Sequence, residues 1–265
     1  KFIMRLLTLS FLLLATTINA QQGYLITYSL DYIPDTTSVK KISEYFILKI
    51  QNNRSHYVSQ TKILQDSIRE EARKNQALAL QLLGDLSKIP KTNFKYEIFT
   101  FDNSMILLKE KIGGREYYYE QPINDLMNWK IDSEIKEVNG IKCQLATTNF
   151  GGREYEAWFS LDIPASLGPY KFIGLPGLII SINDLENNYR FQVVDISQTQ
   201  NLNIEENPEK RSKKINKKEY LDIKLKSQDL IVERAKQHGL TLSEEGKKLL
   251  LQRQSEFNNP IEKNE

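Results

Sequence analysis

Residues 23–34 read GYLITYSLDYIP, and large side chains occupy every second position of this stretch. Tyr24, Tyr28 and Tyr32 fall on one side of an extended chain, whereas Thr27 and Ser29 fall on the other. A period of two with aromatic and branched side chains is typical of a β-strand. The stretch therefore predicts a strand, and the same pattern recurs along much of the chain.

Similar runs are separated by Asn-Asn, Gly-Gly and Asn-Gly pairs. They cover residues 44–51, 54–60, 94–102, 105–112, 115–121, 140–150, 153–160, 178–184 and 188–196. Asparagine and glycine tolerate the positive φ angles that tight hairpins require. The sequence therefore predicts a mainly β protein of the α+β class, with a large antiparallel sheet that could curve into a half-barrel.

One packed helix is expected near residues 67–84. Ser67 and Glu70 have the spacing of a capping box, and apolar residues follow at helical intervals. Gly84 would end the helix. We expect its apolar side to pack on the sheet.

The composition changes after about residue 196. Six basic residues lie between positions 210 and 218, a pattern that usually indicates a solvated surface. Helical patterns follow at residues 217–237 and 243–254. The chain is thus expected to comprise an antiparallel β domain over residues 21–200 and a charged, partly helical extension over residues 201–265.

Residues 1–20, KFIMRLLTLSFLLLATTINA, resemble a secretory signal peptide. Lys1 and Arg5 give a basic start, and an apolar stretch leads to a small residue, Ala20. The apolar stretch is about half the ~20 residues that a membrane span requires. We expect an exported product without a transmembrane span, located in the periplasm, with outer-membrane association or secretion as alternatives.

Charge and cysteine content narrow the function classes. Cleavage after Ala20 would leave 34 of the 36 basic residues, equal to the 34 acidic ones, so general nucleic-acid binding is not expected. A single cysteine, Cys143, excludes an internal disulfide. It also lies far from the cleavage site, where attachment of a lipid would require it.

The candidate chemical groups are sparse. His56 and His238 stand apart, so neither a metal site nor a cofactor is predicted. No Gly-x-Ser-x-Gly sequence presents a nucleophilic serine, and Cys143 falls within a predicted strand, where we expect it to be a small buried residue. No residue is assigned a catalytic role.

A short sequence occurs twice. Gly113–Tyr117 and Gly151–Tyr155 both read GGREY, and each precedes an aromatic strand. Two copies are too few to establish a repeat architecture. We interpret both as hairpin turns, in which Arg115 or Arg153 pairs with a carboxylate across neighbouring strands.

Residues 168–182, GPYKFIGLPGLIISI, interrupt an apolar run with glycine and proline. Proline presets φ, and glycine allows conformations that other residues avoid. The segment therefore predicts a rigid loop between two strands, with Leu175 and Leu178 packed on the sheet.

These residues resemble the hallmark of the GLPGLI family, a group of exported proteins found mainly in Bacteroidetes. The similarity extends from the leader to the closing Asn259–Glu262 and is densest over residues 141–196. The resemblance implies export but no reaction, cofactor or catalytic residue. The hallmark residues are Gly168, Pro169, Lys171, Phe172, Gly174, Leu175, Pro176, Gly177, Leu178 and Ile179.

The sequence favours a non-enzymatic envelope protein that binds a protein partner or an apolar ligand, with Tyr155, Trp158 and Tyr170 as the candidate face. An analogy with the half-barrels of periplasmic lipoprotein carriers would place the helix near residue 67 in the concavity. Two alternatives stay open: a hydrolase with a site assembled from separate strands, and a structural subunit of an outer-membrane-associated assembly. The sequence does not assign an oligomeric state.

Overall fold

The computed structural model describes residues 23–85, 89–102, 104–124, 126–200, 202–237, 243–244 and 257–263. The predicted signal peptide lies outside these residues, as does nearly all of the helix predicted at 243–254.

The strands form one sheet in the order β12-β6-β5-β4-β3-β2-β1-β11-β10-β9-β8-β7, which does not close into a barrel. Its first half contains β1 (Gly23–Tyr32), β2 (Ile42–Gln51), β3 (Arg54–Ser59), β4 (Tyr96–Phe101), β5 (Met105–Ile112) and β6 (Arg115–Pro122). Its second half contains β7 (Lys130–Val138), β8 (Ile141–Phe150), β9 (Arg153–Ser160), β10 (Leu178–Asp184) and β11 (Tyr189–Thr199).

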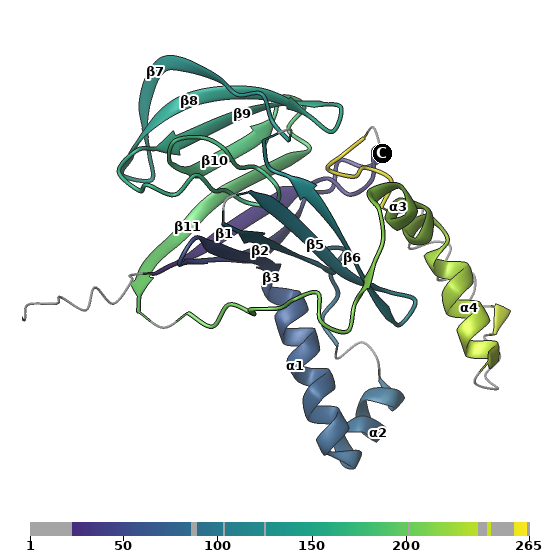
Figure 1. Cartoon of the computed structure of the whole chain (residues 1–265). Coiled ribbons are helices and arrows are strands. Elements are labelled where there is room, and N and C mark those ends of the chain that lie inside the picture. Colours follow the sequence, from purple (N-terminus) through teal and green to yellow (C-terminus); the bar gives the residue numbers. More distant parts are fainter. Residues whose placement is uncertain are drawn as a thin grey trace, which may run out of the picture.

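The predicted α+β class and half-barrel form are confirmed. The halves β1–β6 and β7–β11 face each other across the junction of β1 with β11 (Figure 1). Phe46 on one half and Phe191 on the other have ring centroids 6.4 Å apart. Each such buried side chain contributes roughly 1.5–3 kcal/mol by leaving water, so this shared aromatic core holds the sheet in its curved form.

The strand predictions omit two elements. β7 was not predicted because its side chains are exposed along almost its whole length and give no alternating apolar pattern. β12 (Lys213–Lys214) falls within the basic run and consists of two residues. It pairs with β6 in parallel, so the expectation of a wholly antiparallel sheet is wrong at this edge.

The helix predicted near residues 67–84 is two helices, α1 (Gln60–Lys74) and α2 (Gln76–Gly84). Ser59, not Ser67, is the N-cap, with extended backbone and a side chain that accepts from Lys62 N at 3.1 Å. The end at Gly84 is as predicted. The capping-box spacing was misleading because the same residue pattern also occurs within a helix.

The expectation that this helical segment packs on the sheet holds in part, because α1 contacts β2 and β3 while much of its surface stays exposed. Gln65 is the only buried residue of α1, and Ile63 and Leu64 are 43% and 50% exposed. The helix projects away from the sheet after β3 (Figure 1). It does not fill the concavity, because a different part of the chain already occupies that space.

The C-terminal part contains α3 (Lys217–Leu225) and α4 (Ser227–Gln237). Tyr220 of α3 packs its ring 4.9 Å from that of Tyr119 on β6, and its hydroxyl donates to Glu110. Lys224 also contacts Glu110 at 3.0 Å. These contacts fix α3 beside the β6 edge. Within the described part of the chain, no helix is long and apolar enough to cross a bilayer.

Candidate functional site

The concave face is filled by the loop of residues 161–177 between β9 and β10, here called the hallmark loop. Phe172 and Leu175 of this loop are 0% and 1% exposed. The loop is tied to its flanking strands, since Leu178 N donates to Ile163 O at 3.1 Å and Ile179 N to Leu167 O at 3.0 Å. Leu175 and Leu178 are both buried, as predicted.

Two glycines of the hallmark loop have separate structural roles. A Cβ on Gly177 would lie 2.0 Å from Ser160 O, so the loop returns to the sheet through a gap that admits no side chain. Gly174 has φ +97°, a conformation that favours glycine, although a Cβ there would make only ordinary contacts with the Trp129 ring at 3.8 Å. Nearby, Trp129 Nε1 donates to Ile173 O at 2.8 Å. The glycines therefore set the path of the loop.

Lys171 of the hallmark loop forms a buried ion pair with Glu262. The ammonium lies 2.6 Å from Glu262 Oε1, and the two side chains are 1% and 4% exposed. Tyr170 donates to the same oxygen, and Lys217 of α3 contacts Oε2 at 3.0 Å. One carboxylate thus joins the loop, the helix and the end of the chain.

The pKa values of this cluster follow from burial and charge. Burial lowers the pKa of Lys171 below its usual value, although Glu262 opposes the shift. Burial would raise the pKa of Glu262, but Lys171 and Lys217 outweigh it, and this pKa falls below its usual value. At neutral pH the carboxylate is therefore ionised despite being buried.

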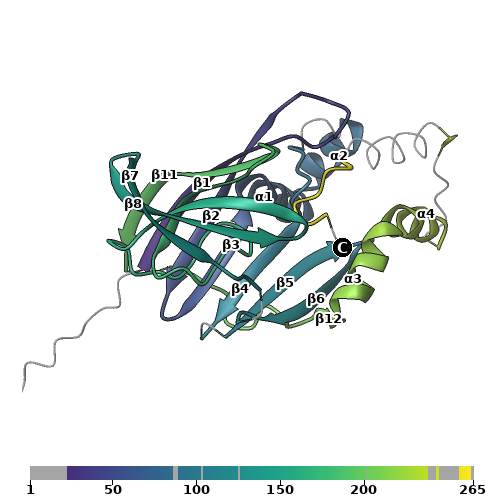
Figure 2. The same cartoon turned by 90° about the horizontal axis from the view of Figure 1, so that it is seen from above.

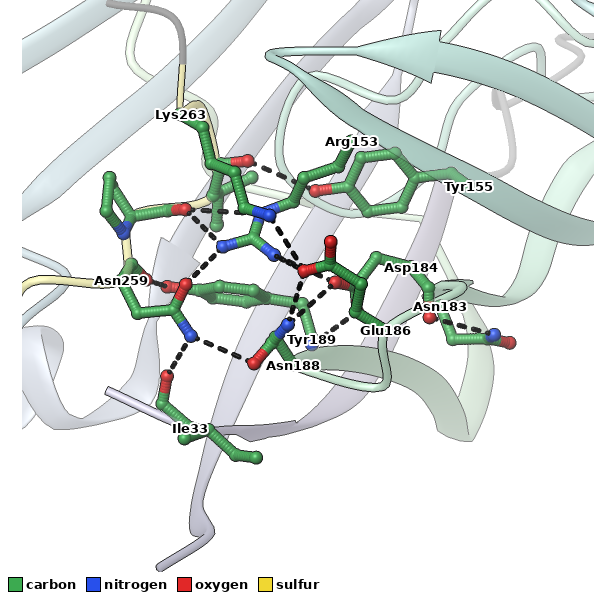
Figure 3. A network of polar contacts seen from close by, with 12 residues as sticks. Ile33, Arg153, Tyr155, Asn183, Asp184, Glu186, Asn188, Tyr189, Asn259 and Lys263 are labelled. Atoms are coloured by element: carbon green, nitrogen blue, oxygen red, sulfur yellow. Dashed lines mark hydrogen bonds and ion pairs between the residues drawn. The ribbon is translucent and has the colours of Figure 1, made fainter. Parts of the chain in front are cut away.

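Arg153 of β9 lies at the centre of a second polar network (Figure 3). Its side chain is 1% exposed, and its guanidinium donates to Asp184 Oδ2 at 2.9 Å. The guanidinium also donates to Pro260 O at 2.9 Å and to the side-chain oxygen of Asn259. Tyr189 N donates to Asp184 Oδ1 at 2.7 Å. The predicted pairing of Arg153 with a carboxylate is therefore present, and it extends to the C-terminal residues.

The C-terminal segment (residues 257–263) is bound through its main chain. Three successive carbonyls each accept a hydrogen bond from a buried side chain. The pairs are Asn259 O with Tyr189 Oη, Pro260 O with Arg153 Nη2, and Ile261 O with Tyr155 Oη.

The side chain of Asn259 and the turn before β9 complete this binding. The amide of Asn259 donates to Ile33 O at 2.8 Å and to Asn188 Oδ1 at 3.1 Å. A Cβ on Gly151 would lie 2.6 Å from Glu262 Cα, so the turn fits closely against the segment. In Figures 1 and 2 the segment ends beside α3, at one end of the half-barrel.

The three residues of the predicted binding face do not come together. Tyr155 and Tyr170 are 1% and 8% exposed and belong to the core. Trp158 is also buried, at 4% exposure, but its side chain lies on the opposite face of β9, because successive residues of a strand alternate between faces. The sequence named both members of the Lys171–Glu262 pair within separate motifs but gave no signal that they meet.

The outer face around Trp158 carries a groove of about 360 Å³, here called the outer groove. Residues from β9, β10 and β11 line it in two rows across the strands. The rows are Trp158, Ser181 and Gln192, followed by Glu156, Asn183 and Arg190. Lys136 of β7 covers the Trp158 ring, with its ammonium 3.5 Å from the ring centroid. Sequence reasoning identified Trp158 but missed this polar surface.

The groups considered for hydrolysis lie apart from the outer groove. His56 Nε2 lies 2.8 Å from Glu97 Oε2, and its ring stacks on Phe99. Burial opposes ionisation of Glu97, but its contacts with His56 and Lys62 lower its pKa to about 2. Glu97 is therefore held as a carboxylate in an ion-pair network.

Cys143 is buried, and burial raises its pKa to about 11. The thiolate, not the thiol, is the nucleophilic form of cysteine. Cys143 is therefore protonated at neutral pH and acts as a small packing residue, as predicted.

Comparisons with known proteins agree with this fold and leave the activity open. A family model described as a protein of unknown function (Porph_ging) matches residues 151–181, which contain β9 and the hallmark loop. No curated protein matches the chain.

Two solved structures of PNGF-II resemble the fold at 12% identity, with TM-scores of 0.54 in the C2 crystal form and 0.53 in the P21 form. The C2 match covers 78% of this chain and 33% of that chain, so this chain spans about a third of PNGF-II. An outer membrane lipoprotein-sorting protein domain from Vibrio parahaemolyticus matches with a TM-score of 0.27 and 8% identity, over 70% of this chain and 88% of that domain.

Proposed function

We propose that this chain is an exported, non-enzymatic protein of the GLPGLI group that binds a protein partner in the cell envelope. The GLPGLI sequence and the family match over residues 151–181 support the grouping. Residues 1–20 would be removed on export to the periplasm. Residues 21–200 would form the β scaffold, and residues 201–265 would pack against its edge and its concave face.

The observation that carries this proposal is the exposed edge strand β7 beside the outer groove. β7 pairs with β8 on one side and ends the sheet on the other. Its Ile131 and Ile135 are 47% and 56% exposed. An unpaired strand edge with exposed apolar residues is a common site for the addition of a partner strand.

The concave face is already occupied, which favours a protein partner over an apolar ligand. The hallmark loop and the C-terminal segment fill it with buried side chains, so the interior that would shelter an apolar ligand is already packed. The outer groove instead presents amide and charged groups that suit the polar surface of a protein. Hydrolysis is not proposed, because neither His56 nor Cys143 lines the outer groove.

Site-specific photo-crosslinking in the native host would test the proposal. A photoreactive residue at Asn187, which lines the outer groove, should give one discrete protein adduct. Arg190→Glu in the groove and Ile135→Asp on β7 should each remove this adduct and weaken the purified partner's binding at least tenfold. Glu154→Lys, at an exposed position of β9 that does not line the groove, is the matched control and should leave binding unchanged.

The proposal fails if the adduct persists in both variants with unchanged affinity. It also fails if the purified mature protein carries a stoichiometric lipid, since the partner would then not be a protein.

A further inference from the structure

The C-terminal segment is bound in the manner of a peptide ligand. Its three successive carbonyls meet side-chain donors, and its backbone makes few bonds to other backbone groups. These few include Asn259 N to Pro34 O at 3.1 Å and Lys263 N to Gly151 O at 2.5 Å. Recognition of an extended chain through main-chain carbonyls and selected side chains is how proteins bind peptides.

The walls around the segment are held by bonds that do not involve it. β9 pairs with β8 on one side and β10 on the other, and β11 pairs with β1 along its length. The hallmark loop has its own hydrogen bonds to β10 and to Trp129. The strands and the backbone of the hallmark loop therefore keep these hydrogen bonds when the segment is absent, which lowers the ordering cost of binding.

The charges of the cleft define the occupant. Without the segment, Arg153 would keep Asp184 at 2.9 Å, so this half of the cleft would remain neutralised. Lys171 would instead lose Glu262 and leave a buried ammonium without its carboxylate partner. Because an unpaired buried charge is costly, the cleft selects a peptide that presents a carboxylate at this point. The hydrogen bonds to Asn259 add a requirement for an amide three residues earlier.

We propose that the cleft around residues 257–263 is an exchangeable peptide-binding site, occupied in cis by the chain's own C-terminal segment and able to bind the same segment of a second copy. Binding in cis dominates in the intact chain, because a tether gives an effective concentration of about millimolar. Binding in trans therefore requires a copy whose own cleft cannot hold its segment. This inference does not depend on the outer groove.

The test begins with the full chain, so that it folds with its own segment in place. A protease site introduced between residues 245 and 256 is then cut, and a fluorescent peptide of residues 257–265 is added. The labelled peptide should replace the resident segment and show saturable binding by fluorescence anisotropy.

Two neighbouring charges of the peptide provide a matched comparison. Glu262 is buried, whereas Lys263 pairs with the exposed Glu186 at 2.7 Å. An unlabelled Glu262→Gln peptide should therefore compete at least tenfold more weakly than the natural peptide. A Lys263→Gln peptide should compete within about fivefold, because surface ion pairs contribute about 0–1 kcal/mol.

A second arm tests binding between copies. The Gly151→Val variant cannot hold its own segment, because its Cβ would collide with Glu262. Gly151→Val is mixed with cut protein from which the released peptide has been removed, so that one copy offers a free segment and the other an empty cleft. The two should form a 1:1 complex in sedimentation velocity experiments. Two copies of Gly151→Val should not associate. If Gly151→Val does not fold, the peptide arm alone decides.

Three results would overturn the inference. One is the absence of exchange with a hundredfold excess of natural peptide below the unfolding temperature. Another is unfolding of the cut protein as the segment leaves, which would make the segment an ordinary part of the core. The last is equal competition by the natural and Glu262→Gln peptides.

Discussion

The two copies of GGREY have the same local structure and different surroundings. Gly113–Tyr117 joins β5 to β6, and Gly151–Tyr155 joins β8 to β9. Both glycines of each pair lie in the left-handed region, with φ between 54° and 85°. Arg115 is exposed, whereas Arg153 is buried in the network of Figure 3.

The difference shows that the pentapeptide determines the turn but not whether its side chains are buried or what they contact. The second copy is covered by the C-terminal segment, whose contacts with Arg153 span 106 and 107 positions of sequence. The first copy has no such cover on Arg115. Matched substitutions in the two copies therefore separate local from long-range contributions to stability.

Replacement of the two arginines should give the largest contrast. Arg153→Ala leaves Asp184 buried without its cation, so we expect a loss of about 3–5 kcal/mol in the free energy of unfolding. Arg115→Ala changes an exposed side chain and should change the free energy of unfolding by at most about 0.5 kcal/mol. Urea unfolding of the mature protein measures both, and equal losses would remove the distinction between the copies.

Replacement of the first glycine of each pair should give the next contrast. Gly113 and Gly151 have φ of 54° and 55°. Alanine at either position should therefore lower the free energy of unfolding by about 1–2 kcal/mol, because a residue with a Cβ is strained in the left-handed conformation. Alanine at Gly151 also meets Glu262 at 2.6 Å, and we expect a further loss of about 1–3 kcal/mol. A smaller loss for Gly151→Ala than for Gly113→Ala would contradict the observed packing.

Acid unfolding should report on the C-terminal segment that packs over Gly151–Tyr155. The pKa of Glu262 is lower in the folded chain than in the unfolded one, so its contribution is present above the unfolded pKa and is lost as pH falls through the folded pKa. The wild-type free energy of unfolding should therefore decrease more steeply below about pH 4.5 than that of Glu262→Gln. Urea titrations between pH 7 and pH 3 test this, and parallel curves would speak against a buried, ionised Glu262.

Removal of the tyrosine hydroxyls should give the smallest contrast. Tyr155 donates to Ile261 O at 3.2 Å in the buried cleft, so Tyr155→Phe should lose about 1 kcal/mol. Tyr117 is half-buried, and Tyr117→Phe should stay within about 0.5 kcal/mol. Thermal unfolding with a common reference resolves such differences, and a larger loss for Tyr117→Phe would reverse the comparison.

The sequence predicted the parts of the fold that depend on short-range patterns. Alternating apolar residues located ten strands, and glycine and asparagine pairs located their turns. β7 was missed because an exposed edge strand has no buried face to impose alternation. The start of α1 was misplaced because Ser67 has the capping-box glutamate three residues later, whereas the true cap, Ser59, has Lys62 at that position and so lacks the pattern.

The candidate site was predicted only in pieces. Lys171 and Glu262 both belonged to recognised motifs, but they lie 91 positions apart, and their contact depends on the path of the whole chain. The Arg153 ion pair was anticipated because a carboxylate on a neighbouring strand was within reach. The outer groove was missed because it combines polar residues from separate strands that give no periodic signal.

A double-mutant cycle on Lys171 and Glu262 tests most directly whether the hallmark loop and the C-terminal segment stabilise one another. Lys171→Met and Glu262→Gln should each lower the free energy of unfolding by about 3–5 kcal/mol, since each leaves a buried group without its partner. The double variant should lose at least about 2 kcal/mol less than the two single losses combined. Additive losses, equal to within about 0.5 kcal/mol, would contradict the account.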